Sequence, residues 1–240
     1  MATHSPEHLW IKVGEQVIWE SKLEKLLGIL IDKELKFSNH VERLCKQASG
    51  KVTALTRLVN IIPMEKKKIL MNSFVESQFC YCPLVWMFCC SRRLNNKINH
   101  IQERALRIVY RDYISPFEVL LKRNDSVCVH HRNIQHVATA MFRVKHGLSS
   151  KMMKDLFKFH TNSIEKRTFI IPKANTEYMG RLSLRWFGPV VWERMLPERY
   201  KSILLIEKFK EEIKRWIPEN CLCRLCKTYI ASVGFIETFK

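Results

Sequence analysis

Carboxylates are the residues that could carry metal-dependent chemistry, and in this chain they are few and scattered. The four aspartates are Asp32, Asp112, Asp125 and Asp155. Two-metal nucleotidyl transfer needs carboxylates that clamp two cations about 4 Å apart. None of these aspartates neighbours another acid in a strand–turn–strand pattern, and the YRDY sequence at 110–113 follows a predicted helix. A Gly-x-Ser-x-Gly elbow and a His-Glu-x-x-His helix are also missing from the sequence. We therefore predict no catalytic residue.

Cysteines could bind a metal, and three of them lie close together near the carboxy terminus. Cys221, Cys223 and Cys226 supply three thiols within six residues. Structural zinc sites use four ligands, usually in two separated pairs, and no Cys or His follows Cys226. Zinc binding therefore stands as an alternative to plain reduced thiols, which are typical of a chain without a secretion signal. A second candidate cluster consists of Cys128, His130, His131 and His136.

The basic residues are the strongest chemical signal in the sequence. The formal net charge is +18 and the isoelectric point is about 9.7. Residues 36–111 alone hold 14 Lys and Arg against 4 Glu and no Asp, a net charge of +10. A domain this basic repels itself unless a polyanion is present, and nucleic acid is the polyanion that proteins most often meet. The composition therefore favours a nucleic-acid partner.

One predicted helix, at residues 92–110, carries its basic residues on one flank. At 100° per residue, its apolar residues fall in one sector and Glu103 lies opposite that sector. The adjacent sector holds Lys97, His100, Arg104, Arg107 and Arg111. A one-sided basic flank is expected where a helix follows phosphates, although an ordinary solvated face remains the alternative. The candidate nucleic-acid contacts are Lys66, Lys67, Lys68, Lys97, Arg104, Arg107 and Arg111.

The elements that must position these residues are mostly helical. Apolar spacings of three and four predict helices at residues 38–62, 92–110, 132–144 and 206–216, and another beginning after Pro63. Residues 160–185 are predicted to be irregular. Near the amino end, residues 11–19 predict a hairpin around Gly14-Glu15, and the apolar run at 26–31 predicts a third strand. The expected fold is mainly α, a helical bundle with a small amino-terminal β piece (α+β).

Several short sequences, in order along the chain, resemble one known family. They are KLLGILID at 25–32, SQFCYCPLVW at 77–86, IQERALR at 101–107 and GPVVWE at 188–193. This order resembles the carboxy-terminal part of reverse transcriptases from non-LTR retrotransposons of the jockey type. The resemblance implies that residues 1–35 end a palm domain, with Leu27, Gly28 and Ile29 similar to the primer grip. It further implies a helical thumb-like region at 36–111, a helical post-thumb region at 112–217 and a Cys-containing tail at 218–240.

The resemblance also carries expectations about function. The endonuclease, fingers and catalytic palm of the family would lie upstream of Met1, so the chain is expected to be a truncated carboxy-terminal fragment of an RNA-directed DNA polymerase. Such a fragment would bind RNA and DNA as template and primer but would not polymerise alone. No cofactor is expected in it, since Mg²⁺ belongs to the full-length polymerase, and the missing palm and fingers would be further partners. The alternative is a helical protein-interaction or adaptor module derived from a mobile element.

The sequence also predicts where the protein resides. No basic segment followed by an apolar segment marks a signal peptide at the amino terminus. The longest strongly apolar run, residues 83–90, is far shorter than the about 20 residues that span a bilayer. We therefore expect a nuclear or cytoplasmic protein without a membrane partner.

Overall fold

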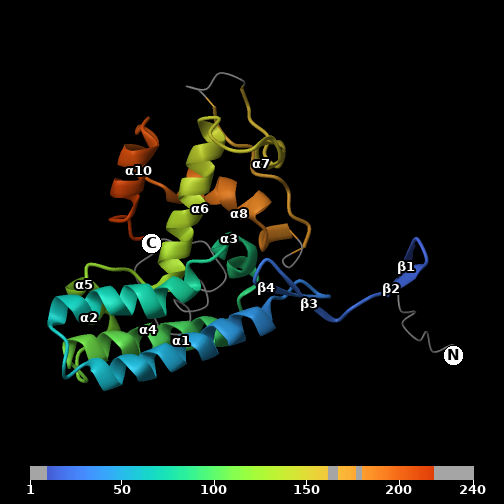
Figure 1. Cartoon of the computed structure of the whole chain (residues 1–240). Coiled ribbons are helices and arrows are strands. Elements are labelled where there is room, and N and C mark those ends of the chain that lie inside the picture. Colours follow the sequence, from blue (N-terminus) through green and yellow to red (C-terminus); the bar gives the residue numbers. More distant parts are fainter. Residues whose placement is uncertain (1–9, 162–166, 177–179, 219–240) are drawn as a thin grey trace.

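Helices dominate the computed structural model, which describes residues 10–161, 167–176 and 180–218 (Figure 1). Two antiparallel two-stranded hairpins precede the helices at the amino end. This arrangement confirms the predicted mainly α fold with a small β piece. The two hairpins do not join into one sheet.

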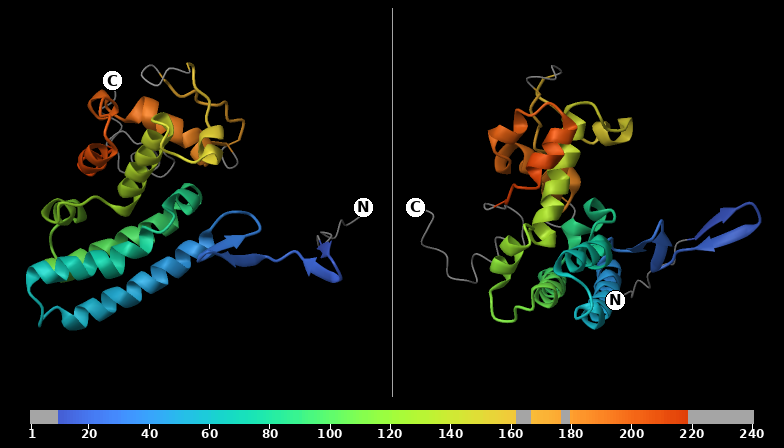
Figure 2. Two further views of the ribbon diagram at one scale, coloured as in Figure 1. Left: turned by 45° about the horizontal axis from the view of Figure 1, so that its top comes forward. Right: turned by 60° about the vertical axis from the view of Figure 1, so that its left-hand side comes forward.

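The first hairpin projects away from the helices (Figures 1 and 2). It consists of β1 (Trp10–Val13) and β2 (Gln16–Trp19), and Val13 pairs with Gln16 across the two-residue turn, as predicted. Gly14 supplies the positive φ of +61° that this turn requires. Every residue of both strands is exposed, including Trp10 and Trp19.

The second hairpin corrects the prediction of a single third strand at residues 26–31. That run instead contains the end of β3 (Leu23–Leu26), a two-residue turn and the start of β4 (Ile29–Asp32). Leu27 and Gly28 both have positive φ, of 47° and 86°, as a tight hairpin turn demands. Because the run is almost entirely apolar, it is typical of a continuous strand. Gly28 is the one residue in it that favours a turn.

Three helical segments form the layer that carries the basic flank, and we call it the three-helix layer. Two of them are parallel to each other, and the third returns the chain between them. α1 (Ser38–Leu58) and α4 (Arg92–Tyr110) run side by side in the same direction (Figure 1). Between them in the sequence, α2 (Met64–Leu70) continues into the π-helical turn η1 (Met71–Val75) and the 3-10 turn η2 (Glu76–Phe79), and returns the chain. α3 (Pro83–Trp86) and η3 (Met87–Cys89) then lead to α4.

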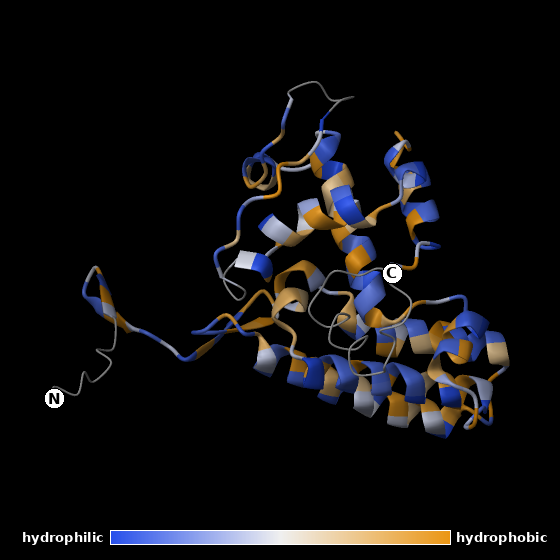
Figure 3. Ribbon diagram, turned by 180° about the vertical axis from the view of Figure 1, so that it is seen from behind, coloured by the Kyte–Doolittle hydropathy of each residue, from blue (hydrophilic) through white to orange (hydrophobic). Residues whose placement is uncertain are grey.

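Burial of the predicted apolar faces stabilises this layer. Val41, Cys45 and Ala48 of α1 are fully buried, as are Ala105 and Leu106 of α4. Each fully buried large aliphatic side chain contributes about 1.5–3 kcal/mol relative to exposure. Figure 3 shows that hydrophilic residues alternate with hydrophobic ones along α1, as expected for an amphipathic helix.

A second group of helices packs around α6 (Val129–Lys145), which follows α5 (Phe117–Arg123). Its core includes a cluster of Phe142, Trp192 and Phe209, with ring centroids of Phe142 and Phe209 4.4 Å apart. The remaining elements are α7 (Lys151–Asp155), α8 (Leu184–Val190), the π-helical turn η5 (Val191–Met195), α9 (Glu198–Lys201) and α10 (Ile206–Ile213).

The sequence predicts no helix at α8, which contains Gly188 and Pro189 and whose first residues overlap the segment 160–185 that is predicted to be irregular. A Cβ at position 188 would lie 2.6 Å from the sulfur of Met141. A side chain at position 188 would therefore require the flexible end of Met141 to move. The predicted last helix at 206–216 is shorter in the structure and ends at Ile213.

Candidate nucleic-acid interface

Three arginines reach from α4 to α1 along one line. Two of these contacts are hydrogen bonds to neutral groups: Arg104 donates to the hydroxyl of Thr53 at 3.2 Å, and Arg111 donates to the amide oxygen of Asn60 at 2.7 Å. The third is an ion pair, in which Arg93 lies 2.6 Å from the carboxylate of Glu42. We call this line of contact the α1–α4 seam. Its residues are Glu42, Thr53 and Asn60 on the α1 side and Arg93, Lys97, Arg104 and Arg111 on the α4 side.

The cations of the seam differ in how far their charge is compensated. Thr53 and Asn60 are neutral, so Arg104 and Arg111 keep a full positive charge while their position is fixed. A guanidinium has five N–H donors, and these contacts engage one nitrogen of each. Arg104 and Lys97 also line a depression of about 340 Å³ on the surface of α4. The seam therefore presents ordered positive charge to solvent.

Arg107, which the sequence placed on the same flank, is held away from the seam. Its Nη2 donates to Glu103 at 2.5 Å and its Nη1 donates to the carbonyl of Asp112 at 3.3 Å. The two side chains of the ion pair are 22% and 23% exposed. The carboxylate of Glu103 compensates the charge of Arg107 locally, unlike the neutral partners of Arg104 and Arg111.

The lysines of α2 are also not brought to the seam. Lys66 is exposed, but Lys67 is only 7% exposed. Lys68 places its ammonium 5.3 Å from the centre of the Tyr110 ring. Tyr110 in turn donates to the carbonyl of Arg123 at the end of α5, so Lys68 faces α5. Lys67 is therefore largely buried and Lys68 lies at the Tyr110 end of α4, while Lys66 stays a predicted contact.

The turn similar to a primer grip is anchored to the helical layer by its backbone. Tyr81 donates its hydroxyl to the carbonyl of Leu27 at 2.7 Å, and Arg43 donates to the carbonyl of Gly28. The backbone N–H of Leu30 donates to Nδ1 of His40 at 3.3 Å. Ile29, between these contacts, is buried. The turn is thus fixed against the start of α1 and the chain before α3.

Burial keeps the His40 ring neutral. Desolvation, followed by the positive charge of Arg43, lowers the pKa of His40 to about 4. A neutral ring leaves Nδ1 free to accept the Leu30 N–H. The sequence gave no sign of these contacts, because they join residues that are distant along the chain.

Asp32 and Asp112, which were considered as metal ligands, serve the backbone instead. The carboxylate of Asp32 accepts N–H bonds from Glu34, Lys36 and Phe37, at 3.1, 3.0 and 2.6 Å. Burial raises the pKa of Asp32, but these hydrogen bonds outweigh it and the pKa is lowered. Asp112 accepts from the N–H groups at 114 and 115. Both acids therefore order loops.

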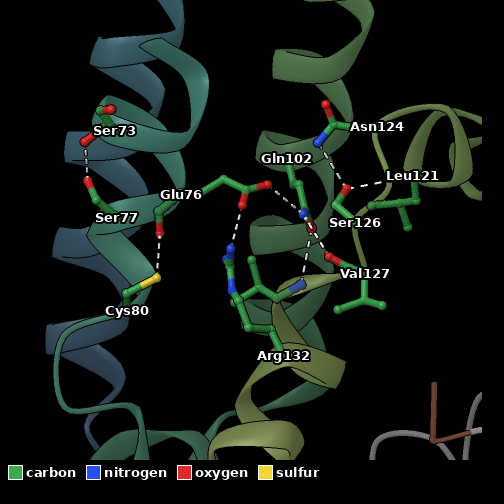
Figure 4. Close-up of polar contacts among 11 residues, drawn as sticks. Ser73, Glu76, Ser77, Cys80, Gln102, Leu121, Asn124, Ser126, Val127 and Arg132 are labelled. Carbon is green, nitrogen blue, oxygen red and sulfur yellow. Dashed lines mark hydrogen bonds and ion pairs between the residues drawn. The ribbon is translucent and has the colours of Figure 1, made fainter. Parts of the chain in front are cut away.

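A second polar cluster joins the three-helix layer to α6 (Figure 4). Glu76 of η2 is 6% exposed and pairs with Arg132 of α6. Its other oxygen accepts from Gln102 of α4 at 2.9 Å, and Gln102 also bonds the backbone of Val127 and Val129. Sequence reasoning missed this cluster, since Glu76 and Arg132 are 56 residues apart.

Among the residues that the structure describes, no group of three or more His, Cys, Asp or Glu is placed to hold a metal. Cys128 instead caps α6, its sulfur accepting from the N–H of His131 at 3.5 Å. Cys221, Cys223 and Cys226 lie outside the described residues. Zinc binding by these three cysteines stays a prediction.

No described helix combines the length and apolarity needed to cross a bilayer. No protein-family model matches the chain, and neither the curated proteins nor the solved structures contain a match. The function must therefore be inferred from the geometry and charge of the chain itself.

Proposed function

We propose that the chain binds the phosphate backbone of nucleic acid along the α1–α4 seam. In this proposal it is the thumb-like, carboxy-terminal part of a retrotransposon RNA-directed DNA polymerase, and its ligand is a template–primer of RNA and DNA. The observation that carries the proposal is the pairing of Arg104 and Arg111 with neutral partners. The hydrogen bonds fix the positions of these side chains, and no carboxylate compensates their charge in these contacts.

Electrostatics favours a backbone ligand over other anions. Phosphates are spaced regularly along a nucleic acid, and each phosphate that a Lys or Arg neutralises releases counterions. From Arg93 to Arg111, α4 advances 18 residues, or about 27 Å at 1.5 Å per residue. A linear polyanion can contact cations over such a length, whereas a small anion contacts one or two. The anchored turn at Leu27 and Gly28 supports the same proposal, since it offers a second fixed point beside α1.

The proposal assigns binding, not polymerisation, to this chain. Asp32 and Asp112 already accept backbone hydrogen bonds, so neither is a free metal ligand. The catalytic carboxylates of the proposed parent polymerase would have to come from outside these 240 residues. We also infer a nuclear or cytoplasmic location, where RNA and DNA are available.

One observation favours a second candidate, a protein-interaction module. Trp10 and Trp19 are 57% and 62% exposed on the β1–β2 hairpin, and the neighbouring Ile11 and Ile18 are exposed as well. Exposed strand edges with apolar side chains invite pairing with another chain. In the proposed parent polymerase that chain segment would be the palm, whereas in a domesticated module it would be another protein.

The two candidates differ in the salt dependence of nucleic-acid binding. We expect the purified chain to bind a fluorescein-labelled RNA·DNA hybrid with a slope of log affinity against log salt of about −2 to −3, because Lys97, Arg104 and Arg111 would each neutralise one phosphate. The measurement is fluorescence anisotropy between about 50 and 200 mM salt. Weak binding with a flat slope would contradict the proposal and favour the interaction module.

A further inference from the structure

The contacts of the α1–α4 seam fix the register of the two helices. Each of the three contacts joins residues that are 51 positions apart. Both helices rise about 1.5 Å per residue. A constant offset over this length therefore means that α1 and α4 lie parallel, with position n of α4 facing position n − 51 of α1.

The same register places Lys97 of α4 opposite Lys46 of α1. Both lysines are exposed, and no carboxylate partner for either is found in the described part of the chain. The thiol of Cys45, the residue before Lys46, also responds to Lys97: burial raises the pKa of Cys45 to about 11, and the charge of Lys97 opposes this rise. Two cations thus face each other where the neighbouring pairs of the seam have an acceptor.

The surface around Lys97 has room for an anion. The depression of about 340 Å³ is lined by residues of α4 that include three cations and the polar side chains of Asn96 and His100. These residues are Arg93, Asn96, Lys97, His100, Ile101 and Arg104. At one side of the depression Glu42 neutralises Arg93, and at the other side Arg104 keeps its charge. Lys97 and Arg104 therefore have no carboxylate partner in the described part of the chain, whereas the charge of Arg93 is compensated by Glu42.

We propose that Lys46 and Lys97 together bind one phosphodiester group of the nucleic-acid backbone, and that Glu42 limits the phosphate track at the Arg93 side. This inference rests on the proposed function and adds three residues to it: Lys46, Arg93 and Glu42. Like charges that face each other are unfavourable in the free protein, and a bound phosphate relieves this repulsion. Glu42 acts in the opposite sense, because its carboxylate repels a phosphate and occupies Arg93.

The test is a salt titration of hybrid binding by four variants: Lys46→Gln, Lys97→Gln, their double and Glu42→Gln. Each single lysine variant should weaken binding but leave the phosphate partly neutralised by the other lysine, and the double variant should lower the magnitude of the salt slope by about 0.7 to 0.9 in total, since one phosphate is lost. Glu42→Gln should raise the magnitude by about 0.7 to 0.9 and tighten binding, because it frees Arg93. Lys208→Gln, an exposed lysine of α10, is the matched control and should change neither.

The outcomes separate the two proposals. A flat slope in the wild type would overturn the proposed function itself. A steep wild-type slope that all four variants leave unchanged would overturn this inference alone. A loss of about 1.4 to 1.8 in the double variant would also overturn it, because a loss of that size corresponds to two separate phosphates. Replacing chloride by inorganic phosphate at equal ionic strength should not displace the hybrid; displacement would indicate a free-anion site instead.

Discussion

Two sets of arginine contacts bridge distant parts of this chain, and they differ in what the arginine meets. In the cluster at η2 and α6, Arg132 pairs with the carboxylate of Glu76, and the two side chains are 20% and 8% exposed. In the α1–α4 seam, Arg104 and Arg111 meet a hydroxyl and an amide at the surface. The first arrangement compensates the charge of a largely buried arginine, and the second fixes the position of an arginine without compensating its charge.

This difference separates a structural role from the proposed binding role. A buried ion pair costs desolvation on both sides, and breaking it leaves a charge without a partner. A surface hydrogen bond to a neutral group costs little to lose. The charge of an arginine alone therefore does not identify it as a candidate for phosphate binding. The candidate residues are those whose hydrogen-bond partner is neutral. Arg93, which meets Glu42 at the surface, lies between the two cases.

The largest expected effect is on stability, from Arg132→Met. Removing the guanidinium leaves the buried carboxylate of Glu76 unpaired, which should lower the free energy of unfolding by about 3 kcal/mol. Urea unfolding followed by circular dichroism measures this change. The double variant Glu76→Gln/Arg132→Met should recover part of the loss, because it leaves no unpaired charge. Equal losses in the single and double variants would show that the pair is not what stabilises this junction.

The next effect concerns pH and the anchored β3–β4 turn. The pKa of His40 is lowered to about 4 from an ordinary value of 6.5, by burial first and the Arg43 charge second. Between these two values the unfolded chain binds the proton more readily than the folded chain. The contribution of His40 is therefore fully present above pH 6.5 and is lost as the pH falls toward 4.

The corresponding measurement is urea unfolding of the wild type and of His40→Gln at about pH 7 and pH 5. The wild type should lose stability on acidification, and His40→Gln should lose less, since glutamine cannot take up the proton. If both proteins respond equally to pH, the neutral ring of His40 does not anchor the turn.

The smallest expected effect is that of Arg107→Gln on binding. Glu103 already compensates Arg107, so its loss should change the salt slope by well under the about 0.7 of one phosphate contact. The Arg107–Glu103 ion pair should also contribute only about 0.5 kcal/mol to the free energy of unfolding. Anisotropy titration of this variant beside Arg104→Gln provides the comparison. An equal loss of slope in both variants would mean that the partner of an arginine does not decide its role.

Local patterns in the sequence predicted most of the helical layer. Apolar residues at spacings of three and four marked the face that α4 buries, including Leu94 and Ile98, because a helix repeats every 3.6 residues. The apolar spacing did not predict the elements in which a glycine lies within a helix or within an apolar run. Gly188 lies within α8, beside the side chain of Met141, and the turn at Gly28 lies inside an apolar run.

The candidate site was only half visible in the sequence. The helical spacing placed Arg104 and Arg111 on one flank, and the structure keeps them there. The pairing of Arg107 was signalled by Glu103 four residues earlier, a spacing that favours ion pairs on a helix. The offset of 51 residues between α1 and α4 has no local signal, since two helices can pack in many registers. Lys46 and Glu42 were therefore missed.

The most direct test of the central claim measures binding and stability on one variant, Arg104→Gln/Arg111→Gln. Glutamine keeps helix propensity and removes two charges. The salt slope for the RNA·DNA hybrid should fall in magnitude by about 1.4 to 1.8, equally for every sequence tested, because phosphate contacts carry no base information. The free energy of unfolding should change by less than about 0.5 kcal/mol. The control Lys151→Gln/Lys208→Gln removes the same charge from exposed sites on α7 and α10 and should leave the slope unchanged. An unchanged slope in the Arg104→Gln/Arg111→Gln protein, with its helix content intact, would contradict binding at the α1–α4 seam and favour the protein-interaction module.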